Sequence, residues 1–300
     1  MKNKKIIIYF LVIAVVGLFF YQFKDELLAI HIVKPIYILP IIFASFAIIL
    51  VNGLINFIIL KSYSLSIPFL TCVGLAGLSA LGNLVIPMRG GSVSNAVYLK
   101  KKFKFSYAKF LSSLSALYVV IFWVSSVCGL LGVLLLRVFY NIGTPWNLAL
   151  FFLIIFVTLS SIIIFSPTIS LTKYSFINKF ISVVNNWNNF NQDRKSILYV
   201  AIATILNILI GTVLSYSMFQ LIGETVNLFK LAIYTIFSGF SILISFTPGN
   251  LGIKETFAIY SASTLGIALP LVLVVSIVER LASLLVSLLV SIVFIKKSHI

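Results

Sequence analysis

Long apolar runs without charge limit the fold of this chain more than any other feature of its sequence. About 20 apolar residues in an α-helix span the hydrocarbon core of a bilayer, and several windows here reach that length. A transmembrane β-barrel would instead alternate apolar and polar residues along short strands. The stretch "IIIYFLVIAVVGLFF" at residues 6–20 does not alternate, so the sequence predicts an all-α integral membrane protein.

The composition agrees with membrane insertion and argues against other classes of protein. Hydrophobic residues make up 61% of the chain and charged residues 9%, which is too little charge for the surface of a soluble protein. The net charge of +16 comes mostly from basic residues in loops beside apolar segments, as the positive-inside rule predicts, so nucleic acid is not expected as a partner. Cys72 and Cys128 lie within apolar runs, and we expect no disulfide framework, metal site or cofactor.

We expect about eight hydrophobic helical segments. They lie at residues 6–23, 36–60, 66–88, 106–136, 146–166, 196–221, 231–247 and 270–295. The third segment ends in "IPMRGG" (86–91), and the seventh ends in "FTPGNLG" (246–252). Because proline removes a backbone donor and cannot continue a helix, both segments are predicted to end in a helix break instead of a clean loop.

The placement of charge favours two broken, re-entrant hairpins that enter the membrane from opposite sides. If residues 66–105 return to the cytoplasm and residues 231–267 return to the outside, most of the 22 basic residues lie on the cytoplasmic side. A complete crossing by residues 66–88 would put the cluster "KKKFK" (100–104) outside, against the positive-inside rule. This topology predicts a multi-pass protein of the inner (plasma) membrane with both termini in the cytoplasm.

The two breaks share a Pro-x-x-x-Gly frame, from Pro87 to Gly91 and from Pro248 to Gly252. Chance alone is one explanation of this match. Paired interrupted segments of opposite topology are, however, typical of the two halves of a transporter. We therefore predict a single polytopic domain over residues 1–300, built as an inverted repeat with halves at about 1–166 and 196–300.

A more polar stretch at about residues 167–195 links the predicted halves. Phe176, Phe180, Val184 and Trp187 recur there at helical spacing, with asparagine and lysine between them. This pattern predicts an amphipathic helix in the membrane interface, either as a simple connector or as a lipid sensor.

Charged and amide side chains at membrane depth define the predicted binding site. A charge near the bilayer centre costs roughly 3 kcal/mol or more, so it needs a partner or a wet cavity. We expect Arg89 and Lys254 to hold a phosphate, with arginine as the better bidentate clamp. The other predicted substrate-binding residues are Asn83, Gly90, Gly91, Asn250, Gly252 and Glu255. Asn52 and Asn56 would line one helix face toward this pocket.

Internal ion pairing is the alternative to ligand binding, with Arg89 or Arg280 paired to Glu255 or Glu279. For Glu279 and Arg280 we favour structural ion pairing. Because they are adjacent in a helix, they point about 100° apart and each needs a different partner. The residues assigned to the helix breaks themselves are Pro87, Pro248 and Gly249.

No catalytic pattern accompanies these residues. The histidines, His31 and His299, lie in a short loop and in the C-terminal tail. The sequence has no nucleophile elbow, Walker loop or metal-ligand spacing, and its six acidic residues leave little material for an active site. We therefore do not expect an enzyme.

Three regions resemble signature regions of the lysylphosphatidylglycerol synthase transmembrane family, which is also described as flippase-like. They are "GNLVIPMRGG" with "AVYLKK" (82–101), "TPGNLGIKE" (247–255) and "ERLAS" (279–283). The resemblance covers roughly residues 5–295 and implies an inner-membrane protein of about eight helices with re-entrant segments. In the best-understood members this domain moves an aminoacylated phospholipid between leaflets. A soluble synthase domain follows in those members; we expect none here, so no synthase activity is implied.

The sequence also departs from the family pattern. Many members carry a glutamate and an arginine where Ser92 and Asn95 stand, and an acidic–arginine pair near Leu117 and Tyr118. The first half of the site is therefore less charged, and a cationic aminoacyl headgroup is less expected than an anionic or phosphate-bearing one.

These observations leave three functions open. The favoured one is a flippase or transporter that moves a phospholipid or lipid-linked headgroup between leaflets, with membrane lipids as partners. The alternatives are a non-transporting accessory protein for an envelope glycosyltransferase or lipid synthase, and an integral-membrane enzyme that acts on lipid headgroups.

Overall fold

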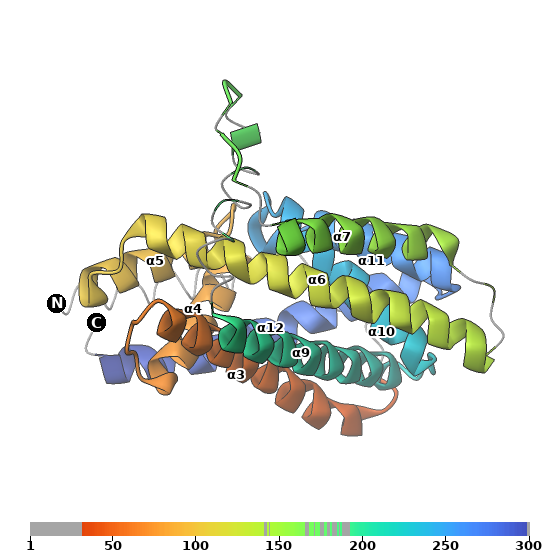
Figure 1. Ribbon diagram of the computed structural model, residues 1–300. Helices are drawn as coiled ribbons and strands as arrows, with labels where there is room; N and C mark the ends of the chain where they lie inside the picture. Colours follow the sequence, from red (N-terminus) through yellow and green to blue (C-terminus); the bar gives the residue numbers. More distant parts are fainter. Residues whose placement is uncertain are drawn as a thin grey trace.

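The structure is a bundle of helices, shown in Figure 1 as a computed structural model. It describes residues 32–140, 143, 145–165 and 193–298, together with residues 168–170, 172–174, 177, 178, 181, 185 and 187. All regular secondary structure within these residues is helical, which confirms the all-α prediction. The predicted first helix at 6–23 lies outside the described residues, as does most of the predicted interfacial helix.

The helices follow the predicted segments closely. They are η1 (Pro35–Tyr37), α3 (Ile38–Ser62), α4 (Phe69–Val85), α5 (Gly90–Phe103), α6 (Tyr107–Tyr140), α7 (Trp146–Phe165), α9 (Arg194–Leu221), α10 (Leu228–Gly239), η2 (Phe240–Ile244), η3 (Pro248–Asn250), α11 (Ile253–Leu265) and α12 (Leu269–Ser298). Within the described residues, α3 with η1, α6, α7, α9 and α12 are long and apolar enough to cross a membrane. The chain is therefore a multi-pass membrane protein.

Polar side chains fix where several helices begin. Asp193 precedes α9, and its carboxylate accepts hydrogen bonds from the backbone N–H (3.1 Å) and the hydroxyl (2.6 Å) of Ser196. Both hydrogen bonds stabilise the charged carboxylate and lower the pKa of Asp193. Asn227 caps α10 in the same way, since its Oδ1 accepts from the backbone N–H of Phe229 at 2.9 Å.

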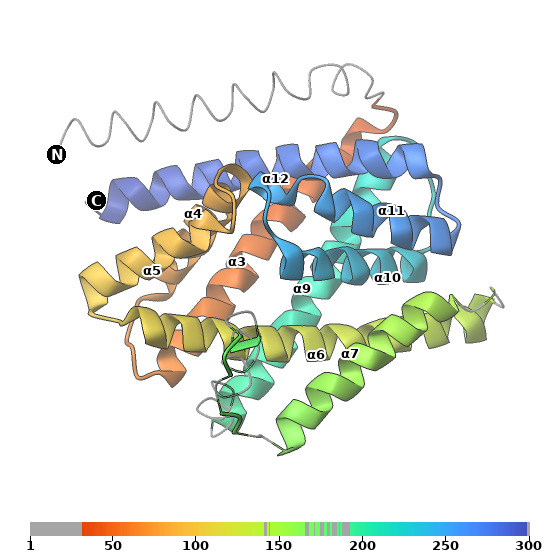
Figure 2. The same cartoon turned by 90° about the horizontal axis from the view of Figure 1, so that it is seen from above.

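Four of the shorter helices form two hairpins, α4 with α5 and α10 with α11. Ile67, just before α4, shares a buried cluster with Leu99 and Phe105 at the far end of α5, so the first hairpin begins and ends at one end of the bundle. Leu231 and Leu265 share another cluster in the same way, at the two ends of the second hairpin. Figure 2 shows the hairpins entering from opposite ends of the bundle, with their tips close together near the middle of α12.

Small residues bring the first hairpin against its neighbours. A Cβ atom on Gly74 of α4 would lie 2.1 Å from the ring of Phe294 on α12. A Cβ atom on Gly82 would lie 2.7 Å from the Cα of Gly91, where α4 and α5 meet. Close packing of this kind is a main source of helix association in membranes, where lipid tails are as apolar as the side chains.

The basic end of α5 lies beside the C-terminal part of α12, because the rings of Tyr98 and Phe294 are 5.9 Å apart. Lys100 to Lys102 of α5 and Lys296 of α12 are therefore at one end of the bundle. This arrangement agrees with the predicted topology, in which these basic residues lie on the same side of the membrane. Which side of the membrane that end faces stays a prediction.

Candidate functional site

The first helix break lies between α4 and α5, at residues 86–89. Met88 and Arg89 there have left-handed φ angles of 54° and 59°. A residue with a Cβ atom costs roughly 1–2 kcal/mol in this conformation, so the neighbouring contacts must hold the break in place. One such contact is the backbone N–H of Gly91, which donates to Oδ1 of Asn83 at 3.0 Å.

Arg89 has no acidic partner at this break. Its guanidinium lies 5.0 Å from the ring centroid of Tyr118 on α6, and no carboxylate of the described residues is within 4.0 Å of it. The aromatic stack continues from Tyr118 to Phe122, at 5.8 Å, and from Phe122 to Phe240 of η2, at 5.0 Å. The cation of the first break is thus held by an aromatic face, with its charge not neutralised by the described residues.

A cavity of about 320 Å³ opens beside Arg89, between α3, α4, α5 and α6. Its polar lining residues are Asn52, Asn56, Ser79, Asn83, Arg89, Ser92, Asn95, Ser113 and Tyr118. Asn95 is only 8% exposed, and its Oδ1 has no hydrogen-bond partner. Buried polar atoms nearly always have a partner, so this oxygen is one of the few exceptions among the described residues.

The second break, at Pro248 to Gly252, has the same backbone pattern as the first. Gly249 and Asn250 have left-handed φ angles of 58° and 56°, at the same two positions after the proline as Met88 and Arg89. The side-chain amide of Asn250 donates to both the carbonyl and the hydroxyl oxygen of Ser241, each at 3.0 Å. Asn250 therefore holds the second break against η2, which directly follows α10.

An ion pair closes the second break against α12. Arg280, which is 4% exposed, contacts Oε1 of Glu255 through Nη2 at 2.5 Å and Nε at 3.1 Å. Its Nη1 donates to the carbonyl of Gly249 at 2.7 Å. Ser276 donates to the same Oε1 at 2.7 Å, and the backbone N–H of Gly252 donates to Oε2 at 2.8 Å. Every charged group in this cluster has a partner of opposite charge.

Lys254 and Glu279 form the second ion pair, with 2.5 Å between Nζ and Oε1. Their side chains are 29% and 34% exposed, compared with 5% for Arg280. Glu279 and Arg280 are neighbours in α12 and meet different partners, in agreement with their angular separation on a helix.

The structure divides the predicted substrate residues between two environments. Asn83 and Arg89 line the cavity, together with Asn52 and Asn56. Lys254 and Glu255 do not line it and are paired with residues of α12. Arg89 and Lys254, which we expected to share one pocket, therefore lie in different environments in the described residues. The reason is that α12 supplies a partner of opposite charge for Lys254 and for Glu255.

The backbone donors also differ from the expectation. Gly91 and Gly252 are among the predicted substrate-binding residues, but in the structure their backbone N–H groups are bonded within the protein, to Asn83 and Glu255. Gly91 instead allows α4 and α5 to pack closely, and Gly252 allows the backbone to turn. A Cβ atom on Gly91 would lie 2.1 Å from the carbonyl oxygen of Ser79, and Gly252 has a φ of 78°.

Several lining residues were not among the predicted site residues. Ser79 lies four residues before Asn83 on α4, so helical spacing from Asn83 gave a signal for it. Asn95 was noted only as a departure from the family pattern, although it lies three residues after Ser92 on α5. Nothing in the sequence indicates that Ser113 and Tyr118 of α6 face the same space.

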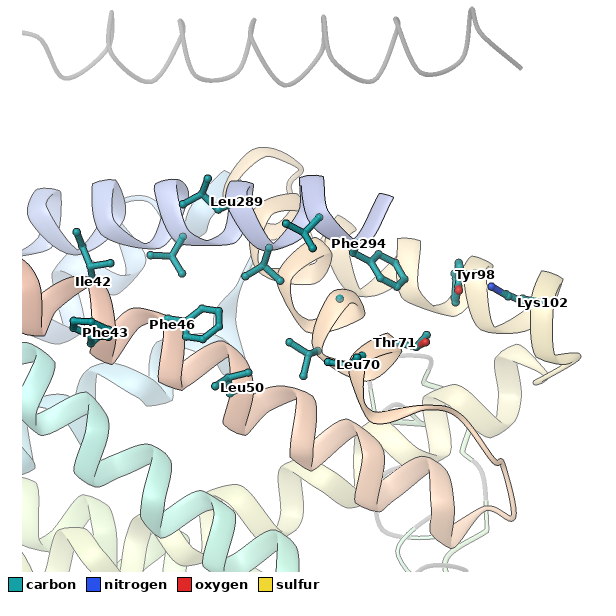
Figure 3. Close-up of a pocket in the computed structure, with 15 residues that line it drawn as sticks. Ile42, Phe43, Phe46, Leu50, Leu70, Thr71, Tyr98, Lys102, Leu289 and Phe294 are labelled. Carbon is teal, nitrogen blue, oxygen red and sulfur yellow. The ribbon is translucent and has the colours of Figure 1, made fainter. Parts of the chain in front are cut away.

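A larger and mostly apolar cavity of about 600 Å³ lies on the other side of the first hairpin. Figure 3 shows Phe43 and Phe46 of α3 and Leu289 of α12 along it, with Tyr98 and Lys102 of α5 at one end. The first hairpin therefore has open space on two sides, one polar and one apolar.

A family model described as "Lysylphosphatidylglycerol synthase TM region" matches residues 6–291, a range that contains both helix breaks and the polar cavity. No curated protein matches the chain.

Proposed function

The chain belongs to the lysylphosphatidylglycerol synthase TM-region family, and from this premise we propose that it moves a lipid between membrane leaflets. The headgroup binds in the cavity beside Arg89 during this movement. One observation carries the proposal. Arg89 lies at a broken helix on the wall of a polar cavity, and it has no acidic partner among the residues that the structure describes. Such a cation needs a wet cavity or an anionic ligand, and the phosphate of a lipid supplies the ligand.

The two hairpins provide the route in this proposal. They are re-entrant in the predicted topology, and the matching left-handed positions after Pro87 and Pro248 support an inverted repeat. Broken helices are tolerated at membrane depth where they border a cavity, as α4 and α5 do here. Since the first hairpin has open space on two sides, it is the element that moves to expose the headgroup to each leaflet in turn. We place the protein in the plasma membrane, with both termini in the cytoplasm.

Reconstituted vesicles test this function. The purified full-length protein is reconstituted into vesicles that carry fluorescent phospholipids in both leaflets. A membrane-impermeant quencher is then added outside, and the loss of fluorescence over time reports the fraction of fluorescent lipid that reaches the outer leaflet. We expect the wild-type protein to make nearly all of the fluorescent lipid reachable and Arg89→Ala to lose this activity. Arg137→Ala is the matched control, because Arg137 is an exposed arginine in the last turn of α6.

The same experiment contains the outcomes that contradict the proposal. If phospholipids and polyprenyl phosphate lipids both stay in their leaflets with the wild-type protein, the transport function fails and an accessory role takes its place. If Arg89→Ala translocates lipid as fast as Arg137→Ala, transport stands but the headgroup does not pass through this cavity.

A further inference from the structure

The cavity beside Arg89 has no acidic residue among the described residues that line it. The described acidic residues all lie elsewhere: Asp193 caps α9, Glu224 is exposed after α9, Glu255 pairs with Arg280, and Glu279 pairs with Lys254. A headgroup in the cavity therefore meets one cation and neutral polar groups, with no carboxylate to neutralise a positive charge of its own.

The neutral groups of the lining are amides and hydroxyls, which exchange hydrogen bonds with other hydroxyls. Each amide and hydroxyl of the lining can both donate and accept, so a partner that does both suits them. A hydroxyl group can exchange hydrogen bonds with Ser92 or Ser79 without bringing charge into the cavity. An ammonium group would also donate, but its charge would add to that of Arg89 in a site of low dielectric constant.

We infer that the cavity selects a lipid whose phosphate meets Arg89 and whose hydroxyl groups meet the amides and hydroxyls of the lining, and that it rejects cationic aminoacyl headgroups. This inference rests on the proposed function for the presence of a lipid headgroup at this site. A cationic headgroup is rejected because none of the described lining residues has a carboxylate to pair with its charge. A site can discriminate between ligands by leaving the charge of the wrong one unpaired, as well as by contacting the right one.

The size of the cavity fits the same class of ligand. Its volume of about 320 Å³ is at the lower end of the range for small-molecule sites, which holds a phosphate with a small polyol. This chemistry occurs in two kinds of lipid: the phosphoglycerol headgroup of a phospholipid and a sugar linked to a polyprenyl phosphate. Both present one anionic phosphate next to several hydroxyl groups.

Direct binding to the full-length protein in detergent separates these classes. The probes are dioctanoyl phosphatidylglycerol, dioctanoyl lysylphosphatidylglycerol and a short-chain polyprenyl phosphoryl glucose, each titrated while bound lipid is counted by native mass spectrometry. We expect phosphatidylglycerol or the sugar lipid to bind about tenfold or more tightly than the lysyl lipid, a difference of about 1.4 kcal/mol. The tighter of the two hydroxyl-bearing probes identifies the source of the headgroup.

A pair of neighbouring substitutions sharpens the test. Asn95→Asp places a carboxylate on the cavity wall, so the preference against the lysyl lipid should shrink or reverse. Ser94→Asp is the matched control, because Ser94 is the preceding residue on α5, is exposed and does not line the cavity. It should keep the wild-type ratio. The wild-type ratio remains decisive if Asn95→Asp fails to fold.

The outcomes distinguish this inference from the function on which it rests. Equal binding of all three probes, or tighter binding of the lysyl lipid, overturns the selectivity and leaves the transport proposal intact. If Arg89→Gln binds every probe as tightly as the wild-type protein does, the cavity is not a headgroup site. The selectivity and the proposed route through the cavity then fail together, and the vesicle experiment alone decides whether the protein translocates lipid.

Discussion

The two helix breaks of this protein have the same backbone pattern and opposite chemistry. Each has a proline followed by two left-handed residues, and each forms the tip of a hairpin. At the second break the first left-handed residue is Gly249, and the ion pair of Glu255 with the buried Arg280 joins the break to α12. At the first break both left-handed residues have side chains, and the cation at the tip has no acidic partner among the described residues.

This difference shows how one backbone device serves two purposes. Where the charged groups satisfy one another, as Glu255 and Arg280 do, the break is a fixed part of the scaffold. Where a strained residue holds an unneutralised cation on a cavity wall, as Arg89 does, the break is suited to bind an anion. The predictions below test this division, beginning with the largest expected effect.

The largest loss of stability should come from Arg280→Ala at the second break. It leaves the partly buried carboxylate of Glu255 without its cation and the carbonyl of Gly249 without its donor. Breaking a buried pair costs about 3–5 kcal/mol, and we expect about 3 kcal/mol here because the Glu255 side chain is 17% exposed. Thermal unfolding in detergent measures this loss. Arg137→Ala should unfold almost as the wild-type protein does, because Arg137 is exposed. An unfolding temperature for Arg280→Ala equal to that of the control would show that the second break is not held by this pair.

A smaller loss is expected from Gly91→Ala in the first hairpin. The new Cβ atom would lie 2.1 Å from the carbonyl oxygen of Ser79, so α5 must move away from α4, at a cost of about 1–3 kcal/mol. Gly239→Ala in the second hairpin is the control. Gly239 has a helical φ of −62° and nothing within 4 Å of the added atom, so alanine should stabilise by about 0.4–1 kcal/mol. Changes of the same sign in both variants would argue against the close approach of α4 and α5.

The smallest effect on stability should come from Lys254→Ala. Its ion pair with Glu279 is about a third exposed, and partly exposed pairs contribute about 1 kcal/mol or less. Thermal unfolding should therefore change far less than in Arg280→Ala. A loss of stability as large as that of Arg280→Ala would show that the two ion pairs stabilise the fold equally.

The sequence predicted the fold well because its strongest signals are local. Apolar runs marked the helices, and Pro87 and Pro248 marked the breaks with correct positions. The site was harder to predict, because partner choice depends on packing between distant segments. Glu255 and Lys254 looked like ligand groups in the sequence, and only the path of α12 brings Arg280 and Glu279 to them.

The same limit applies to the polar cavity. Its residues come from α3, α4, α5 and α6, and the sequence alone relates only those at helical spacing, such as Asn52 and Asn56. The stacking of Arg89 on Tyr118 depends on the angle between α5 and α6, for which the sequence has no signal.

The most direct test replaces the two cations, one at a time, by the same neutral residue. Arg89→Gln and Lys254→Gln are reconstituted in vesicles of identical composition at equal protein density, and the rate of lipid translocation is measured for each. We predict that Arg89→Gln loses translocation while Lys254→Gln retains it, because only Arg89 lines the cavity. Loss of translocation in Lys254→Gln with full activity in Arg89→Gln would contradict the division of the two breaks into a binding element and a scaffold.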